Sequence, residues 1–106
     1  MEYTLIVARM APEDTERVSG VWAESDATEL PRLAGVRQRR LFRFNGLYFQ
    51  LIGAEAGMAG RIEGLRGHPL FQDVNRKLKP FIEAYDPLTW RSPRDAMAEE
   101  FYAWNA

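Results

Sequence analysis

Residues 24–52, ESDATELPRLAGVRQRRLFRFNGLYFQLI, decide how this chain folds. They predict the end of a helix, a connector marked by Pro31 and Gly35, and two strands that meet at Asn45-Gly46. Asn-Gly is a strong hairpin signal because both residues tolerate the positive φ of a type I′ turn. The two strands, over residues 35–44 and 47–54, are therefore expected to pair antiparallel.

The two-residue turn also fixes which residues share a face of the hairpin. Phe44 is expected opposite Leu47, and side chains alternate between the two faces from there outward. One face then carries Phe42, Phe44, Leu47, Phe49 and Leu51, and the other carries Arg39, Leu41, Arg43, Tyr48, Gln50 and Ile52. We expect the aromatic face to pack on helices and the mixed face to look away from them, into a cavity. Arg39 and Gln50 would lie on the mixed face as diagonal neighbours within reach of each other.

The segments before and after the hairpin complete the prediction of the fold. An apolar run at residues 4–10 predicts a first strand, and Pro12, followed by acidic residues, predicts a helix start. The expected buried face of that helix consists of Val18, Val21, Trp22 and Ser25. A second helical region is expected from about residue 58, with a break at residues 67–69 and an end near Lys79-Pro80.

The last part of the chain predicts a loop and one more strand. Asp86-Pro87 and Ser92-Pro93 mark the loop, and residues 99–104 predict the final strand. The order strand, helix, strand, strand, helix, strand indicates an α+β class with a ferredoxin-like βαββαβ antiparallel sheet covered on one face by two helices. The uncovered face is expected to meet a second copy, giving a dimeric α+β barrel.

Size and composition restrict the kind of protein. The 106 residues suffice for one domain, residues 1–106, so a large cavity is expected to need a homodimer. A net charge of -1, with 14 basic and 15 acidic residues, argues against a nucleic-acid or membrane partner despite the arginines at 37, 39, 40 and 43. There is no cysteine and only one histidine, so a cysteine-ligated or multi-histidine metal site is excluded within one protomer. No signal peptide or apolar run of ~20 residues is present, and a soluble, cytoplasmic protein is expected.

Several blocks of the sequence carry a resemblance to a known family. They are LIVARM at 5–10, AESDATELP at 23–31, GVRQRRLFRFNGLY at 35–48, RGHPLFQDVNRKLKP at 66–80 and YDPLTWRSPRDAMAEEFYAW at 85–104. With these blocks the chain resembles, almost end to end, the TcmI family of aromatic polyketide cyclases, which act with bacterial type II polyketide synthases. The resemblance implies a homodimer without cofactor or metal. It also implies an intramolecular aldol-type closure of a poly-β-ketone, here expected for a later ring.

The resemblance also implies site residues. An aspartate just past the first helix and an arginine on the second strand of the family correspond to Asp26 and Arg39. Some relatives carry histidines where this chain has Ser25 and Gln50, so a histidine acid or base is not expected at those positions. We expect Arg39 to donate hydrogen bonds to the oxygen that gains charge, or else to form an ordinary ion pair with an acid such as Glu29.

The other candidate residues also have two possible interpretations. Asp26 is expected to accept a proton or orient a water, or else to cap the turn at Thr28. Ser25 and Gln50 are expected to bind substrate oxygens, Tyr48 to stack on an aromatic ring, and Arg43 and Leu41 to line the substrate site. The alternative for each is a structural side chain, and His68 is expected to make a structural hydrogen bond at a helix start.

Two alternative functions stay open at this point. The same dimeric fold serves cofactor-free monooxygenases of polyphenols, so the fold alone does not separate cyclisation from oxygenation. A non-catalytic, chaperone-like subunit of the synthase that binds the nascent chain is the third possibility.

Overall fold

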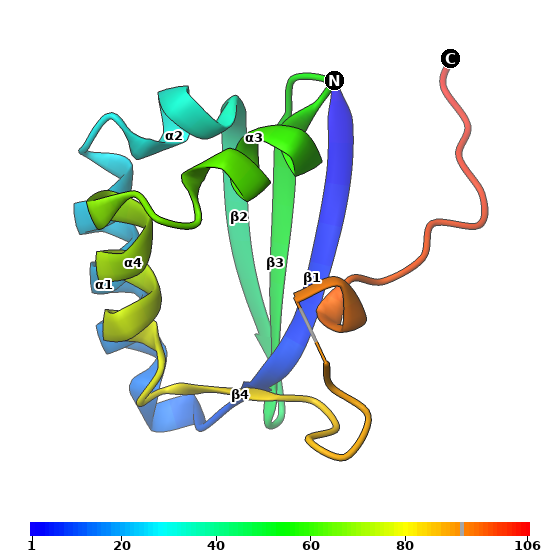
Figure 1. Ribbon diagram of the computed structural model, residues 1–106. Helices are drawn as coiled ribbons and strands as arrows, with labels where there is room; N and C mark the ends of the chain where they lie inside the picture. The colour runs from blue at the N-terminus through cyan, green and yellow to red at the C-terminus, as the bar shows by residue number, and fades with distance from the viewer. Residues whose placement is uncertain (92) are drawn as a thin grey trace.

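One antiparallel sheet and a layer of helices on one of its faces make up the fold (Figure 1). The computed structural model describes residues 1–91 and 93–106, so Ser92 of the predicted loop lies outside the described residues. The strands are β1 (Glu2–Met10), β2 (Val36–Phe44), β3 (Leu47–Ala54) and β4 (Ile82–Ala84), in the sheet order β2-β3-β1-β4. The helices are α1 (Thr15–Asp26), α2 (Leu30–Ala34), α3 (Met58–Leu65) and α4 (Pro69–Leu78), with 3-10 turns at Pro12–Asp14 and Pro93–Ala96. The predicted ferredoxin-like α+β fold is confirmed.

The register of the β2–β3 hairpin is as predicted. Phe44 pairs with Leu47, Leu41 with Gln50 and Arg39 with Ile52. The predicted type I′ turn is wrong, because Asn45 has a φ of 56° but Gly46 is not among the described residues with positive φ. The strand β2 also contains a bulge between Val36 and Gln38, which leaves Arg37 as the extra residue.

The helices follow the sequence signals closely. The helix α1 begins after the Pro12 turn, and Val18 and Ser25 are its buried residues, as expected. The break at residues 67–69 separates α3 from α4, where the His68 ring accepts a hydrogen bond from the backbone N–H of Leu70 at 3.1 Å. This is the structural role predicted for His68. The short helix α2 was expected to be a connector, and it ends at Gly35 with a φ of 75°, a left-handed conformation that favours glycine.

The expected orientation of the sheet is wrong. The mixed face packs under the helices, since Tyr48, Gln50 and Ile52 are buried there. The aromatic face is the open one, with Phe42 and Phe44 exposed by 53% and 66%. The physical reason is that alternation says which residues share a face and not which face a crossover helix covers.

The predicted final strand is also misplaced. The fourth strand is β4, which pairs with β1 through Ala8, Arg9 and Met10. Residues 99–104 have no strand assignment and form an extended tail that leads away from the sheet (Figure 1). Just before the tail, Met97 forms an isolated bridge with Ile6.

The hydrophobic core lies between the sheet and α1 and α4. Its buried members are Ala8, Met10, Val18, Leu30, Tyr48, Val74 and Leu78. The α1–α4 pair packs over β1 and β3, and the small side chain of Ala8 lies opposite Tyr48 in the register. The core therefore places the hydroxyl of Tyr48 next to the inner face of α1.

Candidate functional site

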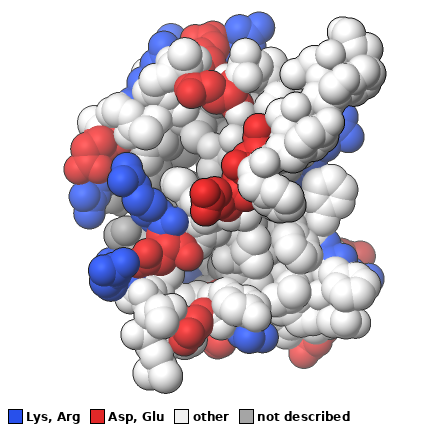
Figure 2. Space-filling model, turned by 90° about the vertical axis from the view of Figure 1, so that its right-hand side faces the viewer, with Lys and Arg blue, Asp and Glu red and all other residues white. Residues whose placement is uncertain are grey.

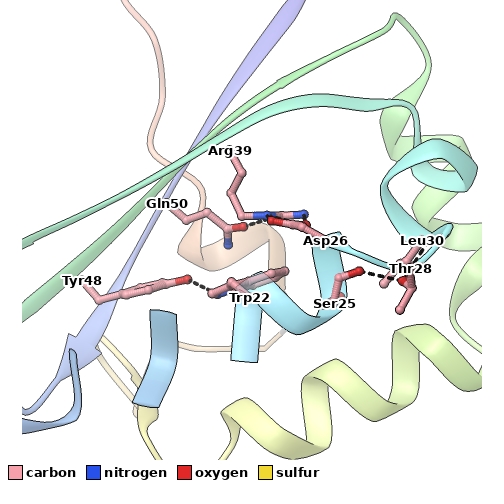
Figure 3. A network of polar contacts seen from close by, with 8 residues as sticks. All are labelled: Trp22, Ser25, Asp26, Thr28, Leu30, Arg39, Tyr48 and Gln50. Atoms are coloured by element: carbon pink, nitrogen blue, oxygen red, sulfur yellow. Dashed lines mark hydrogen bonds and ion pairs between the residues drawn. The ribbon is translucent and has the colours of Figure 1, made fainter. Parts of the chain in front are cut away.

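The guanidinium of Arg39 is the centre of a polar cluster between β2, β3 and the end of α1 (Figure 3). Its Nε lies 3.0 Å from Oδ2 and 3.2 Å from Oδ1 of Asp26, and its second terminal nitrogen lies 3.0 Å from Oδ1. Its first terminal nitrogen donates to the side-chain oxygen of Gln50. The Arg39 side chain is only 11% exposed and that of Asp26 is 36% exposed. The cluster therefore reaches the surface at Asp26.

The indole of Trp22 supports this guanidinium from below. The Arg39 Cζ lies 3.9 Å from the centre of the Trp22 ring, a cation–π geometry. The Trp22 Nε1–H donates a hydrogen bond of 3.0 Å to the hydroxyl oxygen of Tyr48. One side chain of α1 thus contacts both the charged residue of β2 and the phenol of β3, as Figure 3 shows.

The phenol of Tyr48 lies deep in the cluster and is 3% exposed. Burial raises the pKa of Tyr48 to about 12, although the hydrogen bond from Trp22 and the positive charge of Arg39 act in the opposite direction. The phenol is therefore neutral at the pH of ordinary solutions and keeps its proton for donation.

Ser25 lies one residue before Asp26, where α1 turns toward α2. The Thr28 hydroxyl donates to the Ser25 carbonyl oxygen at 2.6 Å and accepts from the Leu30 N–H at 3.2 Å. Ser25 is buried and lines a cavity of about 20 Å³ between α1 and α4, room for about one water.

Comparisons with known proteins decide the family. The model of the polyketide synthesis cyclase family matches residues 2–105. The chain belongs to this family. Within it, the chain is 50% identical over 104 residues to polyketide synthase CurG of Streptomyces cyaneus, covering 98% of this chain and 97% of the relative. It is 45% identical over 102 residues to tetracenomycin F2 cyclase of Streptomyces glaucescens, covering 96% of this chain and 93% of the relative.

A solved structure of a family member has the same fold. It is tetracenomycin F2 cyclase from Streptomyces glaucescens, described as a type II polyketide cyclase, and matches with a TM-score of 0.93 and 43% sequence identity. The match covers 100% of this chain and 99% of that chain. The resemblance given by the sequence blocks and the prediction of a polyketide cyclase are thereby confirmed.

In this cyclase the structure brings together four of the predicted site residues and separates three others. Arg39, Asp26, Gln50 and Tyr48 lie between the sheet and α1, whereas Ser25 lines the cavity between α1 and α4. Arg43 lies apart, because its guanidinium bonds to the Pro12 carbonyl and the Thr15 hydroxyl, both at 3.2 Å. Leu41 packs against the hydrophobic core.

The structure also decides whether Arg39 pairs with Glu29 and whether Asp26 caps the turn at Thr28. Glu29 forms its ion pair with Arg32 at 2.7 Å, and Arg39 pairs with Asp26 instead. The turn is closed by the Thr28 hydroxyl, and the bonds of the Asp26 carboxylate go to Arg39. Asp26 is therefore a partner of the arginine and not a cap.

Trp22 is the site residue that the sequence did not indicate. The periodicity of the first helix predicts Trp22 only as part of its buried face. A signal was present, however, because Trp22 precedes Ser25 and Asp26 by three and four residues, the spacing of neighbours on one helical face. A tryptophan at this spacing lies beside both candidate polar residues.

Two features of the described residues restrict the class of site. Across residues 1–91 and 93–106, no group of three or more His, Asp or Glu side chains is placed to share a metal ion. No helix in the same residues is long and apolar enough to cross a bilayer.

Proposed function

We propose that this cyclase closes a ring by an intramolecular aldol-type reaction of a poly-β-ketone, with Arg39 as the residue that stabilises the developing oxyanion. The observation that carries the proposal is the position of the Arg39 guanidinium. It is nearly buried, stacked on Trp22, and held on three of its donor groups by Asp26 and Gln50. A permanently charged, planar donor fixed in this way needs no reorganisation when charge develops next to it.

The reaction needs orientation more than a strong base. A methylene between two ketones gives up a proton readily, and the resulting carbanion attacks a carbonyl carbon of the same chain. A new C–C bond forms, the C=O π pair moves to oxygen, and the oxyanion takes up a proton before water is lost. Holding both carbons in a fixed geometry contributes up to ~7–11 kcal/mol, and each well-aimed donor adds about 3–4 kcal/mol.

Asp26, Gln50 and Ser25 have supporting roles in the proposed ring closure. The Asp26 carboxylate is open to water on one side and held by Arg39 on the other, so it accepts the methylene proton directly or through a water. Gln50 and Ser25 have no titratable group and hold substrate oxygens by hydrogen bonds.

No cofactor is required by this chemistry. We place the reaction in the cytoplasm, on an intermediate of a type II synthase and at a later ring. The name of the relative CurG, a polyketide synthase protein, supports the association with a synthase.

We also propose that two copies of the chain associate through the open face of the sheet. Exposed aromatic side chains of β2 and a tail with Phe101, Tyr102 and Trp104 exposed by 95%, 77% and 72% both lie outside the core. Figure 2 shows this side of the molecule, where uncharged side chains cover most of the surface, some Asp and Glu side chains lie among them, and Lys and Arg lie mainly at its margins. Exposed aromatic side chains that gather on one face favour contact with another apolar surface, and the tail of one copy supplies matching aromatic groups for the sheet of the other.

Turnover separates the cyclase from the two other functions. The purified protein is mixed with a free poly-β-ketone intermediate in excess, in the absence of oxygen, and cyclised product is counted by chromatography. We expect many equivalents of product per site. Product limited to one equivalent indicates a binding subunit, and product formed only when oxygen is admitted indicates an oxygenase.

The proposed role of Asp26 has its own test. Asp26→Asn keeps the shape of the side chain but removes the negative charge, so we expect a lower kcat and the loss of the acidic limb of the pH–rate profile. Glu29→Gln is the control, since Glu29 is an exposed acid in the next turn that pairs with Arg32. An Asp26→Asn variant with the wild-type pH profile would remove the base role from this residue.

A further inference from the structure

Two donors of the polar cluster have no acceptor in the part of the chain that the structure describes. The Tyr48 oxygen accepts from Trp22, but no hydrogen bond donated by the Tyr48 hydroxyl is found among residues 1–91 and 93–106. The Gln50 side-chain oxygen accepts from Arg39, and its amide nitrogen is likewise without an acceptor in these residues. No buried side-chain nitrogen or oxygen of these residues lacks a hydrogen-bond partner, so the two unused donors are spare capacity and not orphaned atoms, and a ligand oxygen can accept from them.

Trp22 decides where the Tyr48 proton points. A phenol oxygen accepts and donates in different directions, and the indole N–H occupies one accepting direction at 3.0 Å. The same indole carries the Arg39 guanidinium on its face at 3.9 Å. Because α1 holds this ring in place between the two residues, the positions of the charged and the neutral donor depend on one side chain.

We infer that the Tyr48 hydroxyl is a catalytic hydrogen-bond donor to the carbonyl oxygen that gains charge, and that Trp22 is the positioning residue that aims both Tyr48 and Arg39. This inference rests on the proposed function. Tyr48 was expected only to stack on a ring, but its face packs in the core and its hydroxyl points into the cluster (Figure 3). A neutral donor beside a cationic one is suited to a carbonyl that becomes an oxyanion. The hydrogen bonds from both donors become stronger as negative charge develops on the oxygen.

The protonation state of the Tyr48 phenol agrees with its role as a hydrogen-bond donor. Burial keeps the Tyr48 pKa near 12, so the hydroxyl is protonated throughout the range in which a poly-β-ketone is handled. The donor is therefore always available. During ring closure the methylene proton goes to Asp26 or water, and Tyr48 contributes a hydrogen bond without changing its own charge.

The first test compares variants of Tyr48 and Trp22 in steady-state turnover of a free poly-β-ketone. Tyr48→Phe is expected to lower kcat about 10²-fold, as for the loss of one oxyanion donor, and to raise KM by up to about tenfold, the value of the hydrogen bond to the uncharged carbonyl. Trp22→Phe keeps an aromatic face under Arg39 but loses the N–H, so kcat is expected to fall about three- to tenfold. In the double variant the loss is expected to equal that of Tyr48→Phe alone, because the N–H acts through the hydroxyl.

Matched controls separate this effect from loss of structure. Tyr85→Phe and Trp90→Phe remove the same groups from residues that are 52% and 45% exposed, away from the cluster, and are expected to leave kcat unchanged. Thermal unfolding of every variant is followed by circular dichroism. If Tyr48→Phe does not fold, Trp22→Phe carries the test through the ratio of kcat to KM. Wild-type kcat in Tyr48→Phe, or additive losses in the double variant, overturns the inference.

A binding measurement keeps this inference distinct from the proposed function. The probe is 1,8-dihydroxyanthraquinone, a polycyclic compound with ketone and phenol oxygens, titrated into the full chain by fluorescence. Tyr48→Phe is expected to weaken binding about tenfold, the value of one hydrogen bond. If the wild type binds the probe about tenfold more tightly than Tyr48→Phe but cyclises no poly-β-ketone, the proposed function fails. Tyr48 then remains a hydrogen-bond donor to a bound ligand. Equal binding and equal turnover by Tyr48→Phe and wild type remove the donor role and leave the function intact. A wild type that neither binds the probe nor cyclises overturns both.

Discussion

The two faces of one hairpin differ more than any other two regions of this molecule. On the face under the helices, Tyr48 and Gln50 are 3% and 5% exposed, although both are polar. On the open face, Phe42 and Phe44, which are apolar, are exposed by 53% and 66%. Polar groups can be buried at low cost where each acceptor finds a donor, and Trp22 and Arg39 supply those donors.

The burial of polar residues on one face and the exposure of aromatic residues on the other indicate different roles for the two faces. In the proposed function the covered face binds and orients the substrate, because its side chains are held from two sides. The open face has only one layer of contacts, so its aromatic side chains gain most by meeting another apolar surface. According to these proposals, the same two strands serve chemistry on one side and association on the other.

The largest expected effect is on the covered face, at Arg39. Arg39→Met removes the charge and its hydrogen bonds to Asp26 and Gln50, so kcat is expected to fall about 10²–10³-fold, or roughly 3–4 kcal/mol. Arg39→Lys keeps the charge but not the planar fork and is expected to recover only part of the activity. Arg37→Met is the control, since Arg37 is an exposed neighbour that pairs with Glu55. Steady-state kinetics and thermal unfolding are measured together, and parallel losses of stability and activity would assign Arg39 a structural role.

The next effect concerns the stability of the covered face at high pH. The pKa of Tyr48 is raised from 10.0 to about 12 in the folded protein, so between these values the unfolded chain has lost a proton that the folded chain keeps. Its contribution to the free energy of unfolding is therefore full below pH 10 and is lost as the pH rises toward 12, by about 2–3 kcal/mol. Urea unfolding from pH 8 to 12 measures this. Tyr48→Phe is expected to flatten that part of the curve, and an unchanged slope would contradict the assignment.

On the open face, a charge is expected to act on association and not on folding. Phe42→Asp places a carboxylate in the proposed contact and is expected to weaken the dimer by about 2 kcal/mol or more, roughly thirtyfold in Kd. Analytical ultracentrifugation checks this. Leu88→Asp is the control, because Leu88 is 96% exposed in a loop. A wild-type chain that sediments as a monomer at all working concentrations would show that the open face has another occupant.

The smallest effect is expected at the turn between α1 and α2. Thr28→Ala removes the hydroxyl that bonds to the Ser25 carbonyl and the Leu30 N–H, and is expected to lower the free energy of unfolding by about 1 kcal/mol. Thr89→Ala is the control, since the Thr89 hydroxyl makes only a long contact of 3.4 Å with the Asp86 carbonyl in an exposed loop. Equal unfolding midpoints for the two variants in urea would mean that the turn is held by packing alone.

Much of the site could be predicted from the sequence. The Asn45-Gly46 turn gave the register of β2 and β3, and this register placed Arg39 within reach of Gln50. The helix-ending signals around residues 67–69 gave the boundary between α3 and α4. The family followed from ordered blocks along the whole chain and is confirmed by a match over residues 2–105. These features are local, or depend on spacing along one element.

Other features depend on contacts between distant segments. The fourth strand is the three-residue β4, because residues 82–84 are delivered beside β1 by the end of α4, whereas the more strand-like residues 99–104 find no partner strand in the described chain. The stack of Arg39 on Trp22 joins β2 to α1. No pattern within either segment specifies such a pair.

By itself, the sequence determined which residues stand together on each face of the sheet, because side chains in a strand alternate with a period of two. Only the tertiary structure decided which of these faces the helices cover. That period is the same for both faces. The choice depends on the handedness of the crossover from β1 through α1 to the hairpin and on the fit of Trp22 and Asp26 against Arg39, Tyr48 and Gln50.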